Sequence, residues 1–161
     1  MLIITILFYA AMFDINKHKI PNELTFTIIG LGVISHFPLG THPIGFSLCL
    51  IGLSVGFVIT IFLYSINVFG AGDAKLLASL GFIVGYPNII TLIATAIIFS
   101  GLLSVLRLIC HGELASMLSR WKYSLFAGFY EKPESNSVAA GAVPMGGAIL
   151  LAYMYCYFYL F

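Results

Sequence analysis

Six apolar segments, separated by short polar intervals, constrain the fold of this chain more than any other feature. They cover roughly residues 1–15, 23–37, 44–69, 73–86, 88–110 and 139–161. A helix needs about 20 residues to cross a hydrocarbon core of about 30 Å, because each residue adds about 1.5 Å. The third, fifth and sixth segments reach that length, and the polar ends of the others are expected at the membrane boundary. The pattern predicts an all-α, polytopic membrane bundle of about six transmembrane helices.

The scarcity of charge indicates the same class of protein. Only 8% of the residues are charged and 61% are apolar, whereas a soluble domain carries about 25% charged residues. Lipid is therefore the expected solvent for most faces of the chain, and residues 1–161 are interpreted as a single membrane domain. A net charge of +1 gives no reason to expect a nucleic-acid partner.

The basic residues are sorted to one side of the predicted bundle. With six spans, all seven lie on the same side: Lys17, Lys19, Lys75, Arg107, Arg120, Lys122 and Lys132. Because basic residues are enriched in cytoplasmic loops, this side is predicted to be cytoplasmic, with both termini outside. The first segment has no basic region before it and no small-residue cleavage site, so we expect a retained span and not a secretory signal.

The one long polar interval, residues 107–138, is predicted to be a cytoplasmic loop with an interfacial helix. Between Glu113 and Tyr130, apolar residues recur at helical spacing, and Arg120 and Lys122 flank Trp121. Such an amphipathic helix would lie on the membrane surface with its basic residues near the anionic head groups of membrane lipids. An ordinary connecting helix is the alternative.

Two of the six acidic residues suggest chemistry. Asp14 ends the first apolar segment and Asp73 opens the fourth, so both are predicted at the cytoplasmic membrane boundary. Two carboxylates at one depth could share a proton, so that one activates water while the other polarises a scissile carbonyl. The alternative is an ion relay in a small transporter or channel, although no inverted repeat is evident. The remaining acids lie in or beside polar loops and are expected to be solvated: Glu23, Glu113, Glu131 and Glu134.

The residues around Asp73 favour the catalytic interpretation. The run is Phe69-Gly70-Ala71-Gly72-Asp73-Ala74-Lys75-Leu76. Two glycines just before a helix permit positive φ and the close approach of a substrate backbone. Asp73 is also well placed to cap the helix, which is the purely structural interpretation. Lys75 would either balance the charge of a carboxylate pair or mark the cytoplasmic edge of the membrane.

Three motifs, in order along the chain, resemble those of prepilin peptidases. The run Gly70–Leu76 resembles the GxGDxKL form of the GxGD signature of intramembrane aspartyl proteases. The run Asp14–Asn22 resembles the first-aspartate motif of the family, in which Ile-Pro-Asn follows the Asp after five residues. The run Val143–Gly146 resembles its Pro-x-Gly element in the last span.

The resemblance implies roles for these motif residues. Asp14 and Asp73 would be the catalytic pair of an aspartyl endopeptidase that needs no cofactor and no metal, because two carboxylates suffice to activate water. The substrate would be a prepilin or pseudopilin-like membrane precursor, whose leader is cut at the cytoplasmic face of the bacterial inner membrane. Substrate-binding or loop positions would be Gly70, Gly72, Lys75, Pro21, Asn22, Pro144 and Gly146.

The chain also departs from many members of that family. Those members carry an N-terminal extension with paired Cys-x-x-Cys motifs and an N-methyltransferase function. This chain resembles the short branch that serves tight-adherence (Flp-type) pili, so we expect cleavage without methylation. Cys49, Cys110 and Cys156 are isolated and are expected to be small packing residues, and the histidines lack the spacing of a zinc protease helix.

A second catalytic pattern is present but poorly placed. The run Gly52-Leu53-Ser54-Val55-Gly56 matches the G-x-S-x-G pattern of serine hydrolases, yet it lies in the middle of an apolar span and not at a strand-to-helix elbow. Gly52 with Gly56, and Gly81 with Gly85, instead predict close helix–helix contacts through small residues.

Overall fold

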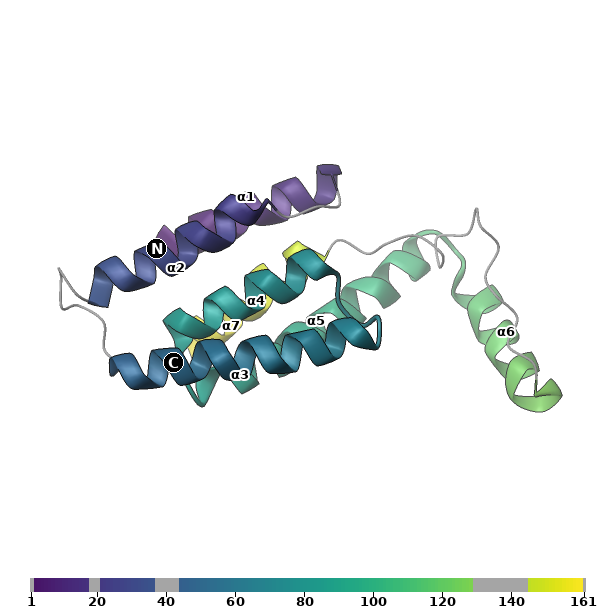
Figure 1. Ribbon diagram of the computed structural model, residues 1–161. Helices are drawn as coiled ribbons and strands as arrows, with labels where there is room; N and C mark the ends of the chain where they lie inside the picture. Colours follow the sequence, from purple (N-terminus) through teal and green to yellow (C-terminus); the bar gives the residue numbers. More distant parts are fainter. Residues whose placement is uncertain (1, 18–20, 37–43, 129–144, 161) are drawn as a thin grey trace. The chain divides into compact units, whose positions relative to one another are not determined.

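The computed structural model describes residues 2–17, 21–36, 44–128 and 145–160, and this part of the chain is helical (Figure 1). It contains α1 (Leu2–Lys17), α2 (Asn22–His36), α3 (Phe46–Ser65), α4 (Ala71–Val84), α5 (Asn88–Cys110), α6 (Leu114–Ala127) and α7 (Met145–Tyr159). The prediction of an all-α fold is confirmed.

Two of the described helices are long and apolar enough to cross a membrane, namely Phe46–Ser65 and Asn88–Cys110. Three shorter apolar helices cover Ile3–Asp14, Asn22–Ser35 and Met145–Tyr159. The third apolar segment extends beyond its helix, which ends at Ser65, and the helix of the fourth begins at Ala71, before the apolar segment does. Residues 139–144 of the sixth predicted segment lie outside the described residues.

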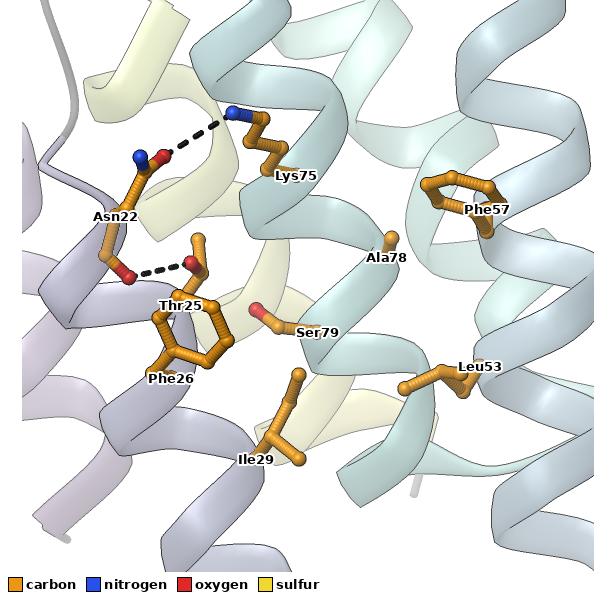
Figure 2. A pocket seen from close by; sticks show the side chains of 9 residues that line it. All are labelled: Asn22, Thr25, Phe26, Ile29, Leu53, Phe57, Lys75, Ala78 and Ser79. Atoms are coloured by element: carbon orange, nitrogen blue, oxygen red, sulfur yellow. Dashed lines mark hydrogen bonds between the residues drawn. The ribbon is translucent and has the colours of Figure 1, made fainter.

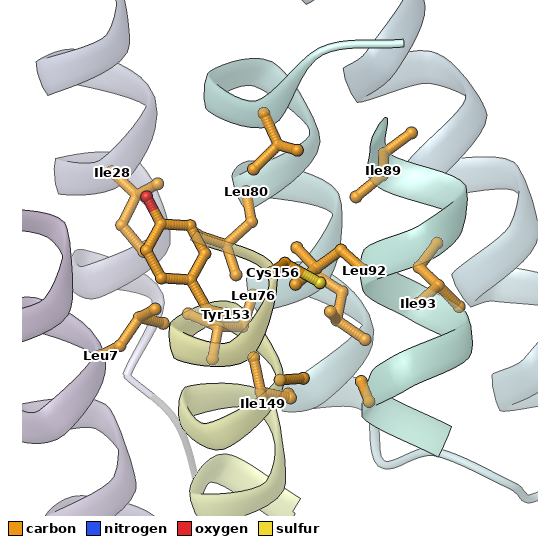
Figure 3. Close-up of a cluster of buried hydrophobic side chains, with 14 of the residues drawn as sticks. Leu7, Ile28, Leu76, Leu80, Ile89, Leu92, Ile93, Ile149, Tyr153 and Cys156 are labelled. Carbon is orange, nitrogen blue, oxygen red and sulfur yellow. The ribbon is translucent and has the colours of Figure 1, made fainter. Parts of the chain in front are cut away.

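The chain divides into two compact units, Met1–Phe99 with Pro144–Phe161, and Ser100–Val143. In the first unit α4 is the central helix, with ten of its fourteen residues buried. Helices α2 and α3 pack against α4, and α1 packs against α7. A helix that is buried on nearly all sides is typical of the centre of a bundle. Its buried neighbours, drawn in Figure 3, come from four other helices: Leu7, Ile28, Ile89, Leu92, Ile93, Ile149, Tyr153 and Cys156.

Glycines bring α3 and α4 into close contact. A Cβ atom on Gly81 would lie 2.5 Å from the carbonyl oxygen of Gly52, and one on Gly52 would collide with the carbonyl oxygen of Gly81. A Cβ on Gly56 would lie 3.1 Å from Ile89 and 3.6 Å from the Cα of Ala78. These contacts confirm the predicted small-residue packing. They also place Ser54 on a helix surface and not at a nucleophile elbow.

The second unit contains the helix predicted between residues 113 and 130. Helix α6 ends at Ala127, and Gly128 follows it with a φ of 68°, a conformation that glycine adopts without strain. Leu118, Trp121 and Leu125 recur at helical spacing and are exposed. An exposed apolar stripe of this kind fits the amphipathic pattern in the sequence.

Candidate functional site

The two candidate catalytic aspartates are both buried in the first unit. Asp14 lies in the last turn of α1 and is 7% exposed, and Asp73 lies in the first turn of α4 and is 8% exposed. Their carboxyl groups are close enough to interact electrostatically. The fold therefore brings together two acids that are 59 positions apart in the sequence.

The start of α7 holds the carboxylate of Asp14. The backbone N–H of Gly146 donates a hydrogen bond of 2.7 Å to Oδ2 of Asp14. Gly146 is the second residue of α7, where backbone N–H groups have no partner within the helix and the helix dipole favours a negative charge. A Cβ on Gly146 would lie 3.2 Å from the Cα of Ala11, so a glycine is needed where α1 and α7 touch. Pro144, the other predicted residue of this element, lies outside the described residues.

The start of α4 holds the carboxylate of Asp73 in a similar way. Gly70 is the N-cap residue, and its backbone N–H donates a hydrogen bond of 3.2 Å to Oδ2 of Asp73. Asp73 is thus the third residue of the helix, and it reaches back to the N-cap as the acidic partner of a capping box does. The predicted capping interaction exists, although Asp73 is not the first residue of the helix.

The expected positive φ at the two glycines before Asp73 was wrong. Gly70 has an extended backbone with φ −74° and ψ 157°, and Gly72 lies inside α4. What matters at Gly70 is the missing side chain, because a Cβ there would lie 2.9 Å from Oδ2 of Asp73. Gly70 is therefore explained by the close approach of the Asp73 carboxylate. The sequence motif alone does not reveal this contact.

One oxygen of the pair lacks a hydrogen-bond partner among the described residues. Oδ1 of Asp73 is buried and has no hydrogen-bond partner within the part of the chain that the structure describes. Leaving a buried polar atom unpaired costs about 1–3 kcal/mol, so such an atom calls for a functional explanation. Among the described residues, no cluster of His, Cys, Asp or Glu could hold a metal ion.

A family model covers this pair of aspartates and most of the chain. The model of the type IV leader peptidase family matches residues 1–105. The chain belongs to this family. Both Asp14 and Asp73 lie in the matched region, whereas Gly146 lies beyond it. No curated protein and no solved structure matches the chain.

Membership makes this chain a protease that acts on the leaders of prepilin-type precursors. The finding does not favour the alternative of a transporter or channel. Two apolar helices of spanning length, together with the family, indicate a membrane protein.

The side chain of Lys75 extends to the start of α2. Its Nζ donates a hydrogen bond of 3.1 Å to Oδ1 of Asn22, the first residue of α2. Two helical positions separate Lys75 from Asp73, which corresponds to about 200° around α4, so the two side chains leave the helix on opposite sides. In this leader peptidase Lys75 and Asn22 therefore join the starts of α4 and α2.

Pro21 lies immediately before the α2 helix of the leader peptidase. Its carbonyl oxygen accepts a hydrogen bond of 3.2 Å from the N–H of Leu24. Proline is favoured at helix starts because its fixed φ fits the first turn and its missing N–H is not needed there. The role expected for Pro21 as a substrate-binding or loop residue stays a prediction.

The sequence motifs missed a pocket of about 400 Å³ between α2, α3 and α4. It is mostly apolar, and Figure 2 shows the side chains that line it: Asn22, Thr25, Phe26, Ile29, Leu53, Phe57, Lys75, Ala78 and Ser79. These residues come from three helices, and only Asn22 and Lys75 belong to a recognisable motif. No local sequence signal could have identified the others.

Proposed function

We propose that this leader peptidase is an intramembrane aspartyl endopeptidase with Asp14 and Asp73 as its catalytic residues. The observation that carries the proposal is the arrangement of the two carboxyl groups. Each is buried, each accepts a hydrogen bond from a backbone N–H at the start of a helix, and Oδ1 of Asp73 is left without a partner in the described chain. Rigid anchoring with one free oxygen is what a general acid–base pair requires.

The chemistry follows from two carboxyl groups that share one proton. The deprotonated carboxylate takes a proton from water, and the resulting hydroxide attacks the carbonyl carbon of the scissile peptide bond. The protonated carboxyl donates its proton to the carbonyl oxygen, which gives a tetrahedral intermediate with two hydroxyl groups. The C–N bond then breaks as the carboxyl that took the proton from water gives it to the leaving nitrogen, and one hydroxyl returns its proton to the other carboxylate. No covalent enzyme intermediate, cofactor or metal takes part in this scheme.

We further propose that residues 1–161 form one membrane domain with six spans, α1 to α5 and α7, and with both termini outside. Two hydrogen bonds support this arrangement. The bond between Gly146 and Asp14 joins the start of α7 to the end of α1, and the bond between Lys75 and Asn22 joins the starts of α4 and α2. Six alternating spans bring these four helix ends to one face, which the basic residues mark as cytoplasmic.

The substrate in this proposal is a short precursor with a basic leader in the cytoplasm and an apolar helix in the inner membrane of a bacterium. The cut falls at the junction between these parts, at the depth where Asp14 and Asp73 lie. Helix α6 rests on the cytoplasmic interface through its exposed apolar stripe. The absence of methyl transfer stays a prediction.

The test is cleavage of a prepilin-like precursor by purified protein. Asp14→Asn and Asp73→Asn are each expected to abolish cleavage, because an amide neither accepts nor delivers the proton. Glu23→Gln is the matched control, since Glu23 is an exposed acid in the first turn of α2 and should be dispensable. Substantial cleavage by either aspartate variant, at equal membrane-inserted protein, would remove that residue from the catalytic pair.

A further inference from the structure

The pocket between α2, α3 and α4 lies on the opposite side of α4 from the catalytic aspartates. Its three residues on α4 are Lys75, Ala78 and Ser79, and their spacing of three and four places them on one helix face. Asp73 precedes Lys75 by about 200° of helical rotation. The pocket is therefore separate from the site that holds the scissile bond.

The two ends of this pocket differ in polarity. Figure 2 shows Lys75 and Asn22 at one end, and Ile29 and Leu53 at the other. The ammonium group of Lys75 donates to the neutral amide of Asn22, and within the described residues no acidic side chain forms an ion pair with it. An uncompensated positive charge beside an apolar slot suits a ligand with an anionic head and an apolar tail.

The lining of the pocket suits a flexible apolar chain. The pocket has a volume of about 400 Å³, and its walls are mostly apolar. A single acyl chain can thread between the rings of Phe26 and Phe57 over the small side chains of Ala78 and Ser79.

We propose that this pocket binds an anionic phospholipid. The phosphate of the lipid lies against the ammonium of Lys75. The amide nitrogen of Asn22 donates a hydrogen bond to this phosphate, while Oδ1 of Asn22 keeps its hydrogen bond to Lys75. One acyl chain runs from this end toward Ile29 and Leu53. The bound lipid joins α2 and α3 across α4, the helix that carries Asp73 on its other face.

The first experiment measures lipid retention without any need for peptidase activity. The full chain is purified from nanodiscs that contain equal amounts of phosphatidylglycerol and phosphatidylcholine, and native mass spectrometry counts the lipid that remains bound. We expect wild-type protein to retain mainly phosphatidylglycerol. Lys75→Gln should reduce this preference roughly fivefold, which is the usual contribution of one basic residue near an anionic lipid. Lys122→Gln on α6 removes an equal charge elsewhere and should leave the preference in place.

A second pair of variants fills the pocket and keeps its charge. Leu53→Trp and Ile29→Trp add bulk from opposite walls, and each should lower the retention of phosphatidylglycerol. Two walls are used so that misfolding of one variant still leaves a test. A photoreactive group on the acyl chain of phosphatidylglycerol should cross-link to the peptides that contain Phe26 and Phe57.

Three results would overturn the proposal. They are equal retention of both lipids by wild-type protein, an unchanged preference in Lys75→Gln, and cross-links that map away from α2 and α3. Cross-linking of the precursor's apolar segment to Phe26 or Phe57 without competition from phosphatidylglycerol would assign the pocket to the substrate instead. Since every readout is binding, failure here leaves the proposed peptidase activity untouched.

Discussion

Substitution of Gly146 by alanine probes how the proposed catalytic pair is held. The added Cβ would lie 3.0 Å from Cβ of Asp14 and 3.2 Å from both the Cα of Ala11 and Oδ2 of Asp14. Ordinary van der Waals contacts lie at 3.4–4 Å, so the neighbours must give by a few tenths of an ångström. Because Ala11 Cα is backbone, α1 and α7 have to separate, and the hydrogen bond of 2.7 Å between Gly146 and Asp14 lengthens.

The expected effect is larger on catalysis than on stability. A displacement of about 1 Å from the productive geometry costs about 100-fold in rate, so a few tenths of an ångström should lower kcat roughly fourfold. Overpacking costs about 1–3 kcal/mol in the free energy of unfolding. The higher helix propensity of alanine offsets about 1 kcal/mol of that cost.

Gly147→Ala is the matched control for this substitution. A Cβ on Gly147 meets no atom within 4 Å, and the residue lies in the same turn of α7. Its activity should stay within about twofold of wild type, with equal or higher stability, because only helix propensity changes.

The assay is cleavage of a reconstituted precursor, with kcat and KM measured at equal amounts of inserted protein and Tm measured in detergent. Gly146→Ala should lower kcat while Tm changes by only a few degrees. If Gly146→Ala cleaves as fast as Gly147→Ala, then the start of α7 does not position Asp14 for catalysis.

Three further predictions concern packing, chemistry and topology. Gly81→Ala should lower Tm in detergent by an amount that corresponds to about 1–3 kcal/mol, since its Cβ would lie 2.5 Å from a carbonyl oxygen of α3. Gly101→Ala is the control and should leave Tm unchanged, because its Cβ meets nothing within 4 Å. Equal Tm values for the two variants would contradict the close α3–α4 contact. Alkylation of the exposed Cys110 and treatment with a chelator should both leave cleavage intact, whereas complete loss with the chelator alone would require a metal. In a Cys110→Ser background, an impermeant thiol reagent added to intact cells should label Thr41→Cys and Tyr86→Cys. It should label Arg120→Cys only after lysis. The reverse pattern would place the aspartates on the outer face of the membrane.

The class of protein was predictable from sequence, and Asp14 and Asp73 could be proposed as a catalytic pair, because both inferences depend on local patterns. Long apolar segments favour helices in lipid wherever they occur, since each helix satisfies its own backbone hydrogen bonds. Asp14 and Asp73 stood out because an acid at the end of an apolar segment is costly without a function. The glycine pairs on α3 and α4 were likewise visible, as small residues four positions apart form one flat helix face.

The way in which these residues are held depends on contacts between distant segments. The hydrogen bond from Gly146 to Asp14 spans 132 positions, and no pattern near either residue indicates which carboxylate the start of α7 would meet. Sequence reasoning attributed Gly70 to backbone freedom, whereas the fold needs it because the carboxylate of Asp73 folds back over the helix start. The sequence left Lys75 with two interpretations, charge balance or a marker of the cytoplasmic edge, and only the fold reveals its hydrogen bond to Asn22 beside the pocket. Apolar patterning thus determined which segments become helices. The packing of α2, α3 and α7 against α4, and of α1 against α7, decided which side chains meet. Such contacts depend on helix rotation and register in three dimensions.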